Sequence, residues 1–397
     1  MNTDISTQSI VISFANICDT LLEYCQKKGF SLAIWRLPFS SKTNFLISFQ
    51  PKKISAESDI ESLPKGFLLA EFEKGMKGEK LFFDADILFD LELGLNDEQR
   101  KILEEQLPGI KFKHNESHLP SLNYSTSNST IKNSFTDSVS KAVTEIANGT
   151  FKKVVLSRRK EVNLSTSLSV GLLYQKLCDK YSNTFNSVIF TPKYGTWIGA
   201  SPEILVSKNS NQIFKTIALA GTQNAFTNTE KEANWSQKEI EEQAYVSRYI
   251  IECLKKIRLR EYEDIGPKTI RVGNLFHLKT DFNVDLKEVN FPNLLGTMLH
   301  LLHPTSAVCG MPKTEAIDFI LKNEHYPREL YSGYLGPINM KDETHLFVNL
   351  RCAKITDTIT FFAGAGITED SDPEKEFLET ELKMESLLGL FDSKINN

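Results

Sequence analysis

Two pairs of glutamates are spaced so that both members of each pair project from the same side of a helix. Glu239 and Glu242 occur in the segment SQKEIEEQAYV, and Glu376 and Glu379 occur in SDPEKEFLETELK. Residues three apart lie on one helical face. Two such pairs facing each other would repel unless a cation lay between them, and oxygen-only ligands on a partly hydrated site suit Mg²⁺. The alternative interpretation is that both pairs belong to solvated helix faces.

A lysine and a glutamate stand where two predicted strands begin. Lys153 opens the apolar run KVVLSR, and Glu203 ends the segment GASPE just before another strand. Burial would lower the pKa of such a lysine and raise the pKa of such a glutamate. Near neutral pH the two side chains would then supply a general base and a general acid. The alternatives are a solvated lysine at a strand end and a glutamate that accepts a backbone N–H beside Pro202.

A glycine-containing strand end precedes the second acidic segment. The sequence FFAGAGI places Gly364 and Gly366 where bare backbone N–H groups could meet an anion, close to a helix N-terminus. It lacks the full G-x-G-x-x-G spacing of a dinucleotide site, and a tight strand-to-helix turn is the alternative. His303 has no second His or Cys at metal spacing, and Cys309 has no neighbouring base. These two observations argue against zinc and against thiol catalysis.

Strands and helices must position these residues, and apolar periodicity predicts where they lie. Helices are expected over 8–27, 135–147 and 234–256, and a last helix begins near Asp372. Its start is indicated by Ser371 or Asp372 as N-cap, Pro373 in the first turn and Glu374 in a Ser-x-x-Glu box. Strands are expected over 31–37, 45–48, 153–158, 187–191, 196–199 and 204–207. Strand-rich stretches with occasional long helices predict an α+β fold.

Composition divides the chain into three parts. Residues 1–113 carry predicted elements but no recognisable chemistry, and residues 132–397 carry all the motifs described above. Between them, residues 114–131 are rich in Ser, Asn and Thr, which predicts a polar surface loop or linker. We expect the first part to belong to the same domain as the last.

The bulk properties favour a cytoplasmic globular protein. The 397 residues are 41% hydrophobic and 24% charged, with a net charge of −5 and both signs interspersed. This charge gives no electrostatic reason to expect nucleic acid or an anionic membrane as a partner. The six cysteines form no C-x-x-C pair, the N-terminus lacks a signal-peptide pattern, and no apolar run approaches the roughly 20 residues that span a bilayer.

The order of the motifs along the chain resembles one known family. The following segments occur in sequence: KVVLSR (153–158), GASPEILV (199–206), ALAGT (218–222), WSQKEIEEQAYV (235–246), LHPTSAVCGMP (302–312), REL-YSGYLG (328–336), LRCA (350–353) and AGAGITEDSDPEKEFLETELK (363–383). Together they are similar to the chorismate-binding enzymes, which include isochorismate, salicylate, anthranilate and aminodeoxychorismate synthases. The resemblance covers roughly residues 135–390. It implies a single large α+β domain of stacked, largely antiparallel sheets with helices packed outside.

The resemblance also assigns site residues. Glu242 and Glu379 match Mg²⁺ ligands, with Glu239 and Glu376 beside them, and Mg²⁺ would hold the ring carboxylate of chorismate. The remaining matches are substrate contacts: Arg351 and Tyr331 for the enolpyruvyl carboxylate, Gly364, Gly366 and Lys383 for further anion contacts, and Gly221, Thr222 and Ala307 for the pocket wall.

The base and the acid decide which reaction the resemblance implies. In family members that add water, a lysine matching Lys153 deprotonates the water for attack at ring C2, and the acid matching Glu203 protonates the leaving C4 hydroxyl. Ammonia-using members lack that lysine. Aminodeoxychorismate synthases carry a nucleophilic lysine at the place of Ala220. Both comparisons favour water as the nucleophile and hence isochorismate as the product.

Three departures bear on this interpretation. Family members often have His before a Leu-x-x-Thr stretch, a place matched here to Asn293, and often His after the second glutamate, where Gln243 stands. Asn cannot transfer a proton, which disfavours pyruvate elimination to salicylate. Ala307 stands where some lyases carry a more polar residue, which also favours a synthase over a lyase.

The expected function is an Mg²⁺-dependent isochorismate synthase for menaquinone or siderophore synthesis, acting as a monomer or weak dimer. The alternatives are a salicylate synthase and a non-catalytic chorismate-binding protein. An ammonia-dependent synthase would need a glutaminase partner.

Overall fold

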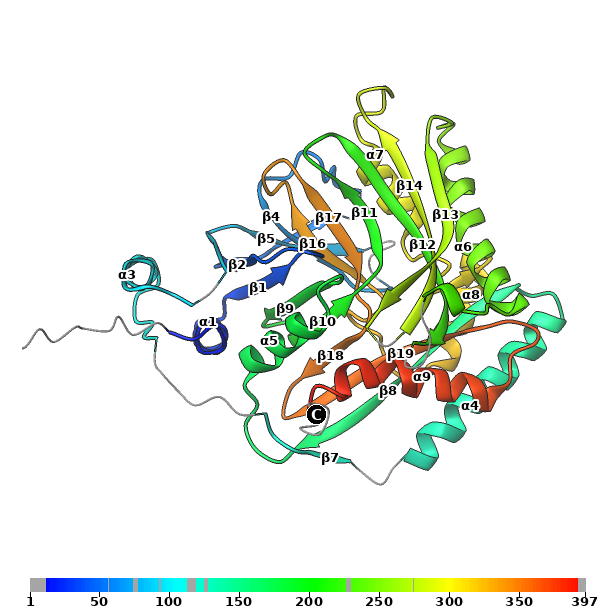
Figure 1. Ribbon diagram of the computed structural model, residues 1–397, viewed down its shortest axis with the longest axis horizontal. Coiled ribbons are helices and arrows are strands. Elements are labelled where there is room, and N and C mark those ends of the chain that lie inside the picture. The colour runs from blue at the N-terminus through cyan, green and yellow to red at the C-terminus, as the bar shows by residue number, and fades with distance from the viewer. Residues whose placement is uncertain are drawn as a thin grey trace, which may run out of the picture.

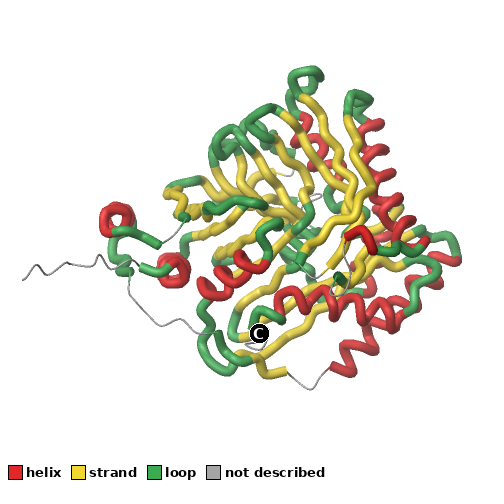
Figure 2. The backbone as a smooth tube through the Cα atoms, viewed as in Figure 1, coloured by secondary structure: helices red, strands yellow, loops and turns green. Residues whose placement is uncertain are grey.

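The computed structural model describes residues 12–391, apart from residues 56, 74–77, 93, 113–118, 125–127, 226–229 and 274. Two large sheets dominate this part of the chain, and helices cover their outer sides (Figures 1 and 2). Each strand pairing within these sheets is antiparallel. The predicted single α+β domain with stacked, largely antiparallel sheets is confirmed.

The first sheet has ten strands, of which β7 pairs only with β8 at the edge of the sheet. In spatial order its strands are β15 (Gly310–Met311), β8 (Lys153–Leu164), β19 (Thr358–Ile367), β18 (Cys352–Ile355), β10 (Gly195–Ser201), β9 (Phe185–Thr191), β1 (Ser31–Arg36), β2 (Thr43–Ser48) and β6 (Ile87–Leu91), with β7 (Leu122–Tyr124) beside β8. The strands predicted over 31–37, 45–48, 153–158, 187–191 and 196–199 are all present here.

The second sheet has nine strands. In spatial order they are β13 (Glu263–Val272), β14 (Leu275–Asp285), β12 (Ile213–Asn224), β11 (Ile204–Lys208), β17 (Thr344–Val348), β16 (Tyr334–Ile338), β4 (Gly66–Ala70), β5 (Glu79–Asp84) and β3 (Lys52–Ser55). The strand predicted over 204–207 is β11.

Helices pack on the outer faces of both sheets (Figure 2). The described helices are α1 (Phe14–Lys28), α3 (Asp97–Gln106), α4 (Asn128–Ala147), α5 (Val170–Lys180), the 3₁₀ turn η1 (Glu230–Glu232), α6 (Gln237–Lys256), α7 (Leu294–Leu302), α8 (Lys313–Asn323) and α9 (Pro373–Leu388). In Figure 1, α6 runs along the second sheet, where it packs against β12 and β14, whereas the red α9 lies along β8 and β19 beside α4. The two acidic helices therefore belong to different sheets. Residues 8–11 of the first predicted helix lie outside the described residues.

Three apolar cores hold the layers together. One lies between the two sheets, where side chains of β1, β9 and β10 meet side chains of β4, β16 and β17. Its largest members include Trp35, Trp197, Phe67 and Phe347, all of them 0–1% exposed. The other two cores lie outside the sheets, under α1, α5 and α9 on one side and under α4, α6, α7 and α8 on the other. Both faces of the central strands are thus buried, which explains their continuous apolar runs.

The first third of the chain is built into both sheets. β1 pairs with β9, and β4 pairs with β16, so neither sheet is complete without it. The segment 114–131 contains β7, and α4 begins within it at Asn128, three residues before the predicted end of the polar loop. The prediction of a loop over the whole segment was therefore wrong. Ser, Asn and Thr there extend the start of a helix and form an edge strand.

The two acidic helices begin at different kinds of cap. In α6, Ser236 and Glu239 form a capping box in which each side chain meets the backbone of the other. In α9, the N-cap is Asp372, which accepts a hydrogen bond from the N–H of Lys375, and Pro373 occupies the first turn. The structure therefore selects Asp372 over Ser371, and Glu374 completes no box with Ser371.

No helix in the described ranges has the length and apolar composition needed to cross a membrane.

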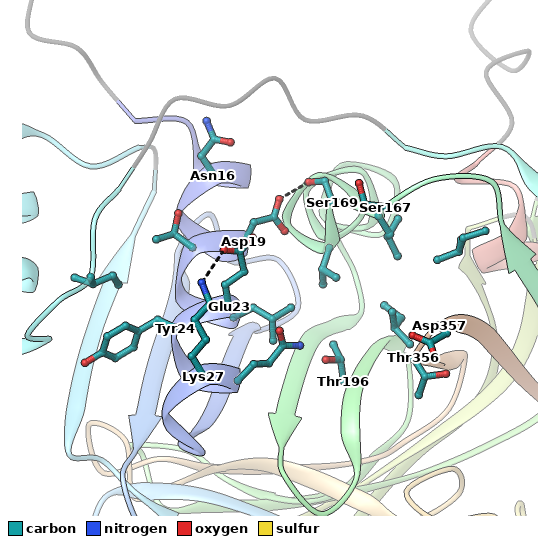
Figure 3. Close-up of a pocket in the computed structure, with 18 of the residues that line it drawn as sticks. Asn16, Asp19, Glu23, Tyr24, Lys27, Ser167, Ser169, Thr196, Thr356 and Asp357 are labelled. Carbon is teal, nitrogen blue, oxygen red and sulfur yellow. Dashed lines mark hydrogen bonds and ion pairs between the residues drawn. The ribbon is translucent and has the colours of Figure 1, made fainter.

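A half-buried carboxylate connects α1 with α5. Asp19 in α1 accepts hydrogen bonds from the Ser169 hydroxyl and from the N–H of Gly171, at the first turn of α5 (Figure 3). The carboxylate thus caps a helix other than its own. Figure 3 also shows Glu23 and Lys27 on α1, whose charged atoms are 4.0 Å apart at the exposed side of the same helix.

Replacing this cap should destabilise the protein measurably. Asp19→Ala leaves the N–H of Gly171 without its acceptor, so we expect a loss of about 1–2 kcal/mol in the free energy of unfolding. Glu23→Ala, on the same helix but exposed, should cost less than about 0.5 kcal/mol. Urea denaturation followed by circular dichroism measures both. Equal losses for the two variants would show that the cap contributes nothing.

Candidate active site

A small cavity opens where the two sheets meet, and most of the predicted substrate and catalytic residues line it. Its volume is about 100 Å³. The predicted residues in its wall are Glu203, Gly221, Thr222, Glu242, Ala307, Tyr331, Arg351, Gly364 and Lys383. Pockets for drug-sized ligands usually hold about 300–1,000 Å³. A ring-sized ligand therefore requires some of these side chains to move.

Lys153 lies directly behind this wall. Successive side chains of β8 point to opposite faces, so Val154 and Leu156 pack in the core with α4 while Lys153 and Val155 face the cavity side. The Lys153 side chain is fully buried, and its Nζ lies 3.0 Å from Oε1 of Glu242 on α6. The predicted burial of Lys153 is therefore present. Its ion pair with Glu242 was not foreseen.

Gly366 makes room for this ion pair. A Cβ at this position would stand 2.6 Å from Oε1 of Glu242 and 3.1 Å from Cε of Lys153. The first distance is too short for a real Cβ, and the second is tighter than most real contacts, so both side chains would have to shift. Gly366 thus acts by being small where strand β19 passes the Lys153–Glu242 contact.

The predicted acidic residues meet lysines. On α9, Glu379 lies 2.7 Å from Nζ of Lys383, which also donates to the carbonyl of Gly364 at 2.9 Å. Burial opposes the charge of Lys383, but Glu379 and Glu242 outweigh it and raise the pKa of the lysine. Burial likewise opposes the charge of Glu242, yet Lys153 and Lys383 hold its pKa below the usual range. Glu242 from α6 and Glu379 from α9 therefore both interact electrostatically with Lys383.

The other two acidic residues lie further from the cavity. Glu376 is only 1% exposed and is paired with Lys238, a residue of α6. Burial and the neighbouring Glu379 raise the pKa of Glu376. Glu239 uses its Oε2 to accept the N–H of Ser236 in the capping box. The Lys238–Glu376 pair ties α6 to α9, whereas Glu239 mainly caps its own helix.

Glu203 is also buried, but its pKa is shifted in the opposite direction to that of Glu242. It is 2% exposed, and the hydroxyl of Thr305 lies 3.3 Å from its Oε1. Burial raises the pKa of Glu203 to about 8, because Thr305, Lys153 and Lys383 offset only part of the desolvation. At neutral pH this carboxyl group keeps its proton. The environment predicted for a general acid is present.

A neutral histidine positions the arginine of the cavity. Nδ1 of His277 lies 2.7 Å from the carbonyl oxygen of Gly221, so Nδ1 carries the proton and Nε2 accepts from Nη2 of Arg351. Burial and the Arg351 charge hold the pKa of His277 well below its usual range. Burial lowers the pKa of Arg351 to about 10, which leaves the guanidinium charged at neutral pH. Gly221 adopts φ +72°, a conformation that favours glycine and turns its carbonyl toward His277.

The placement of Asn293 as the counterpart of the family histidine was wrong. Asn293 is exposed and stands at the start of α7, away from the cavity wall. His277 lines the cavity, and it precedes Leu278 and Thr280 in a His-Leu-x-Thr pattern, one residue shorter than the Leu-x-x-Thr stretch that follows Asn293. This pattern was the signal that could have found it. The argument that Asn293 disfavours pyruvate elimination therefore falls. Gln243, buried in α6, donates to Thr280 at 3.0 Å and so packs behind this strand.

The acidic residues fit a divalent cation by their chemistry. Their donors are carboxylate oxygens from two helices, the type that Mg²⁺ prefers, and lysine ammonium groups now balance three of them. Within the described residues, no three His, Cys, Asp or Glu side chains are close enough together to form a ready metal site. Binding of a cation would therefore require the glutamates to exchange lysine contacts for metal contacts.

The raised pKa of Glu203 predicts a pH-dependent stability. The unfolded carboxyl group loses its proton near pH 4.5, but the folded one keeps it until about pH 8. Stability from this group is therefore complete below pH 4.5 and is lost as the pH rises through 8. Glu203→Gln removes this loss, so its advantage over the parent should grow by roughly 4 kcal/mol between pH 5 and 9. Urea denaturation without divalent cations measures it. A constant difference between the two proteins across this range would contradict the buried, protonated carboxyl group.

Comparison with known proteins shows which family this sequence matches. The sequence profile described as "Chorismate binding enzyme" matches residues 38–392. Isochorismate synthase EntC of Escherichia coli K12 is 31% identical over 264 residues, which cover 65% of this chain and 66% of EntC. Isochorismate synthase MenF of Haemophilus influenzae is 26% identical over 381 residues, which cover 93% of this chain and 79% of that protein. The chain thus spans just under two thirds of the length of EntC.

The fold is shared with a solved structure as well. MenF from E. coli, described as the menaquinone-specific isochorismate synthase, superposes with a TM-score of 0.72 at 21% identity. The superposition covers 91% of this chain and 89% of that one. The profile match extends over most of the sequence and includes the residues of the cavity wall. The chain therefore belongs to the family of chorismate-binding enzymes.

Proposed function

We propose that this protein is an isochorismate synthase, which converts chorismate to isochorismate with Mg²⁺. One observation carries the proposal: a buried lysine and a buried, protonated glutamate lie beside the same cavity. The reaction moves a hydroxyl group from C4 to C2 of the ring without oxidation or reduction. It needs one group that takes a proton and one that donates it, and Lys153 and Glu203 supply the two.

Glu203 is the proposed acid. Its proton is retained at neutral pH and is available to the hydroxyl that leaves C4. Lys153 is the proposed base for the incoming water. It can act only after its contact with Glu242 is broken, since that contact occupies its Nζ. The two proton transfers balance, and the enzyme returns to its starting state once a proton passes back from Lys153 to Glu203 through solvent.

The cationic residues of the cavity are proposed to hold the substrate carboxylates. Arg351 offers a planar fork of donors and stays charged, and Lys383 adds a second positive charge at the Gly364 backbone. Tyr331, buried beside Gly364, presents its hydroxyl to the same region. A dianionic ligand suits this set of donors.

Mg²⁺ is proposed to be held by Glu242 and Glu379, with Glu376 close behind them. Glu239 is the weakest of the four predicted ligands because its carboxylate caps α6. When bound, the ion would supply positive charge for a substrate carboxylate. Menaquinone or siderophore synthesis is the proposed consumer of the product, and the first is the role named for E. coli MenF.

Product identification tests this function. Purified protein incubated with chorismate and Mg²⁺ should yield isochorismate by liquid chromatography, with no pyruvate in a coupled lactate dehydrogenase assay. Pyruvate release with salicylate would instead show a salicylate synthase, an outcome that the presence of His277 in the cavity makes worth measuring. Binding of chorismate without any turnover would show a non-catalytic protein. Either result would overturn the proposal.

The role of Lys153 can be tested separately. Lys153→Ala should lower kcat by about 10²–10⁴-fold, the usual contribution of a general base, while chorismate still binds in the presence of Mg²⁺. Lys152→Ala is the matched control, because Lys152 is the exposed neighbour of Lys153. Steady-state kinetics and calorimetry measure the two effects. A Lys153→Ala variant with nearly parental kcat would exclude Lys153 as the base.

A further inference from the structure

A buried ion pair lies behind the cavity and outside its wall. Arg328 and Glu324, at the end of α8, are 1% and 4% exposed. Nε of Arg328 lies 2.7 Å from Oε2 of Glu324, and Nη2 lies 2.5 Å from Oε1. Burial opposes the arginine charge, but Glu324 outweighs it and raises the pKa of Arg328. Arg328 therefore stays charged inside the protein.

Such a pair is poor evidence for stability. Desolvation of two charges usually cancels their attraction, and apolar replacements of the same size are often equally stable. The role of the pair is then to be sought in the backbone groups that it binds. Arg328 does not line the cavity, yet its donors reach backbone groups of residues that do.

The pair binds three backbone groups on two different segments. Nη1 of Arg328 donates to the carbonyl of Val308 at 2.8 Å, and Nη2 donates to the carbonyl of Val155 at 2.8 Å. Oε1 of Glu324 accepts the N–H of Ser157 at 2.6 Å. Hydrogen bonds to charged groups are about twice as strong as neutral ones. The ion pair therefore ties β8 to the loop that contains Val308.

These contacts extend the hydrogen bonding along the edge of β8 beyond its short pairing with β15. β15 pairs with β8 only through Gly310 with Val154 and Met311 with Lys153. Immediately beyond, the N–H of Val155 still donates to the carbonyl of Cys309 at 2.7 Å. The carbonyl of Val155 and the N–H of Ser157 instead bond to the side chains of the ion pair. These hydrogen bonds thus fix the edge of β8 from Val155 onward, two residues after Lys153, the proposed base.

Both pinned segments carry cavity residues. Lys153 lies two residues before Val155, on the same face of β8, and Ala307 immediately precedes Val308. The carbonyl of Arg328 also accepts the N–H of Tyr331 at 2.9 Å. One side chain and its own backbone therefore connect three parts of the cavity wall.

We propose that Arg328, with Glu324, is a positioning residue that sets Lys153, Ala307 and Tyr331 relative to one another. The inference rests on the proposed function of the cavity. Displacements near 1 Å can cost a reaction about 100-fold in rate. A lysine at position 328 keeps the charge but lacks the planar fork, so its one ammonium group cannot serve Glu324, Val155 and Val308 together.

The test compares three variants of the full-length protein. Arg328→Lys should fold, bind chorismate with a KM within about threefold of the parent, and lose roughly 10–100-fold in kcat. Arg36→Lys is the matched control, because Arg36 on β1 is a half-buried arginine that also donates to a carbonyl, that of Cys178. Its kcat should be parental even if its melting temperature falls. The double variant Arg328→Met with Glu324→Met leaves no charge buried and should also fold and be slow.

The readouts separate positioning from mere stability. In Arg328→Lys, hydrogen exchange of residues 153–158 and 305–310 should accelerate while the rest of the first sheet stays protected. If the folded double-Met variant has parental kcat, or if activity lost in Arg328→Lys scales only with the lost melting temperature as in Arg36→Lys, the positioning role is refuted. A parent protein that turns over no chorismate would refute the proposed function, whereas the exchange data would still report whether the ion pair holds these segments.

Discussion

Opposite charges buried together are the constraint on which the rest of the site depends. Glu242, Glu376 and Glu379 come from two helices on different sheets, and each one meets a lysine. A carboxylate in this position without a partner would be expelled or protonated. Glu203 shows the second outcome, because its lysine neighbours act from too far to offset its burial. Glu242, which contacts a lysine, and Glu203, which does not, thus have pKa values shifted in opposite directions within one small cavity.

The two-sheet architecture creates this arrangement. β8 carries Lys153 and β19 carries the glycines that let α6 and α9 approach it, since Gly366 leaves room for Glu242. β12 and β14 of the other sheet contribute Gly221 and His277, which hold Arg351. The cavity therefore forms only where the sheets meet. The first third of the chain, which contributes strands to both sheets, supports it without lining it.

Much of the fold and the site could be predicted because the signals were local. Helix caps, apolar runs and the i, i+3 spacing of glutamates depend on a few neighbouring residues, and most strands and the acidic helices lie where these patterns placed them. Lysine partners could not be predicted in this way, since Lys238 and Glu376 are 138 residues apart. His277 was missed for another reason. Its His-Leu-x-Thr pattern lies within a strand and is one residue shorter than the Leu-x-x-Thr stretch that pointed to Asn293. Arg328 opens one of the motifs that carry the resemblance, but no role was predicted for it, because its partners are backbone groups of distant segments.

The central claim is that glutamates from α6 and α9 can exchange their lysine contacts for one divalent cation. Calorimetric titration of Mg²⁺ into the parent, Glu379→Gln and Glu374→Gln tests it most directly. Glu374 is an exposed glutamate of the same helix, paired with Lys132. The account predicts one bound Mg²⁺ for the parent and for Glu374→Gln, and affinity at least about tenfold lower for Glu379→Gln, equivalent to roughly 1.4 kcal/mol. Equal affinities in all three proteins, or no binding to the parent, would contradict it.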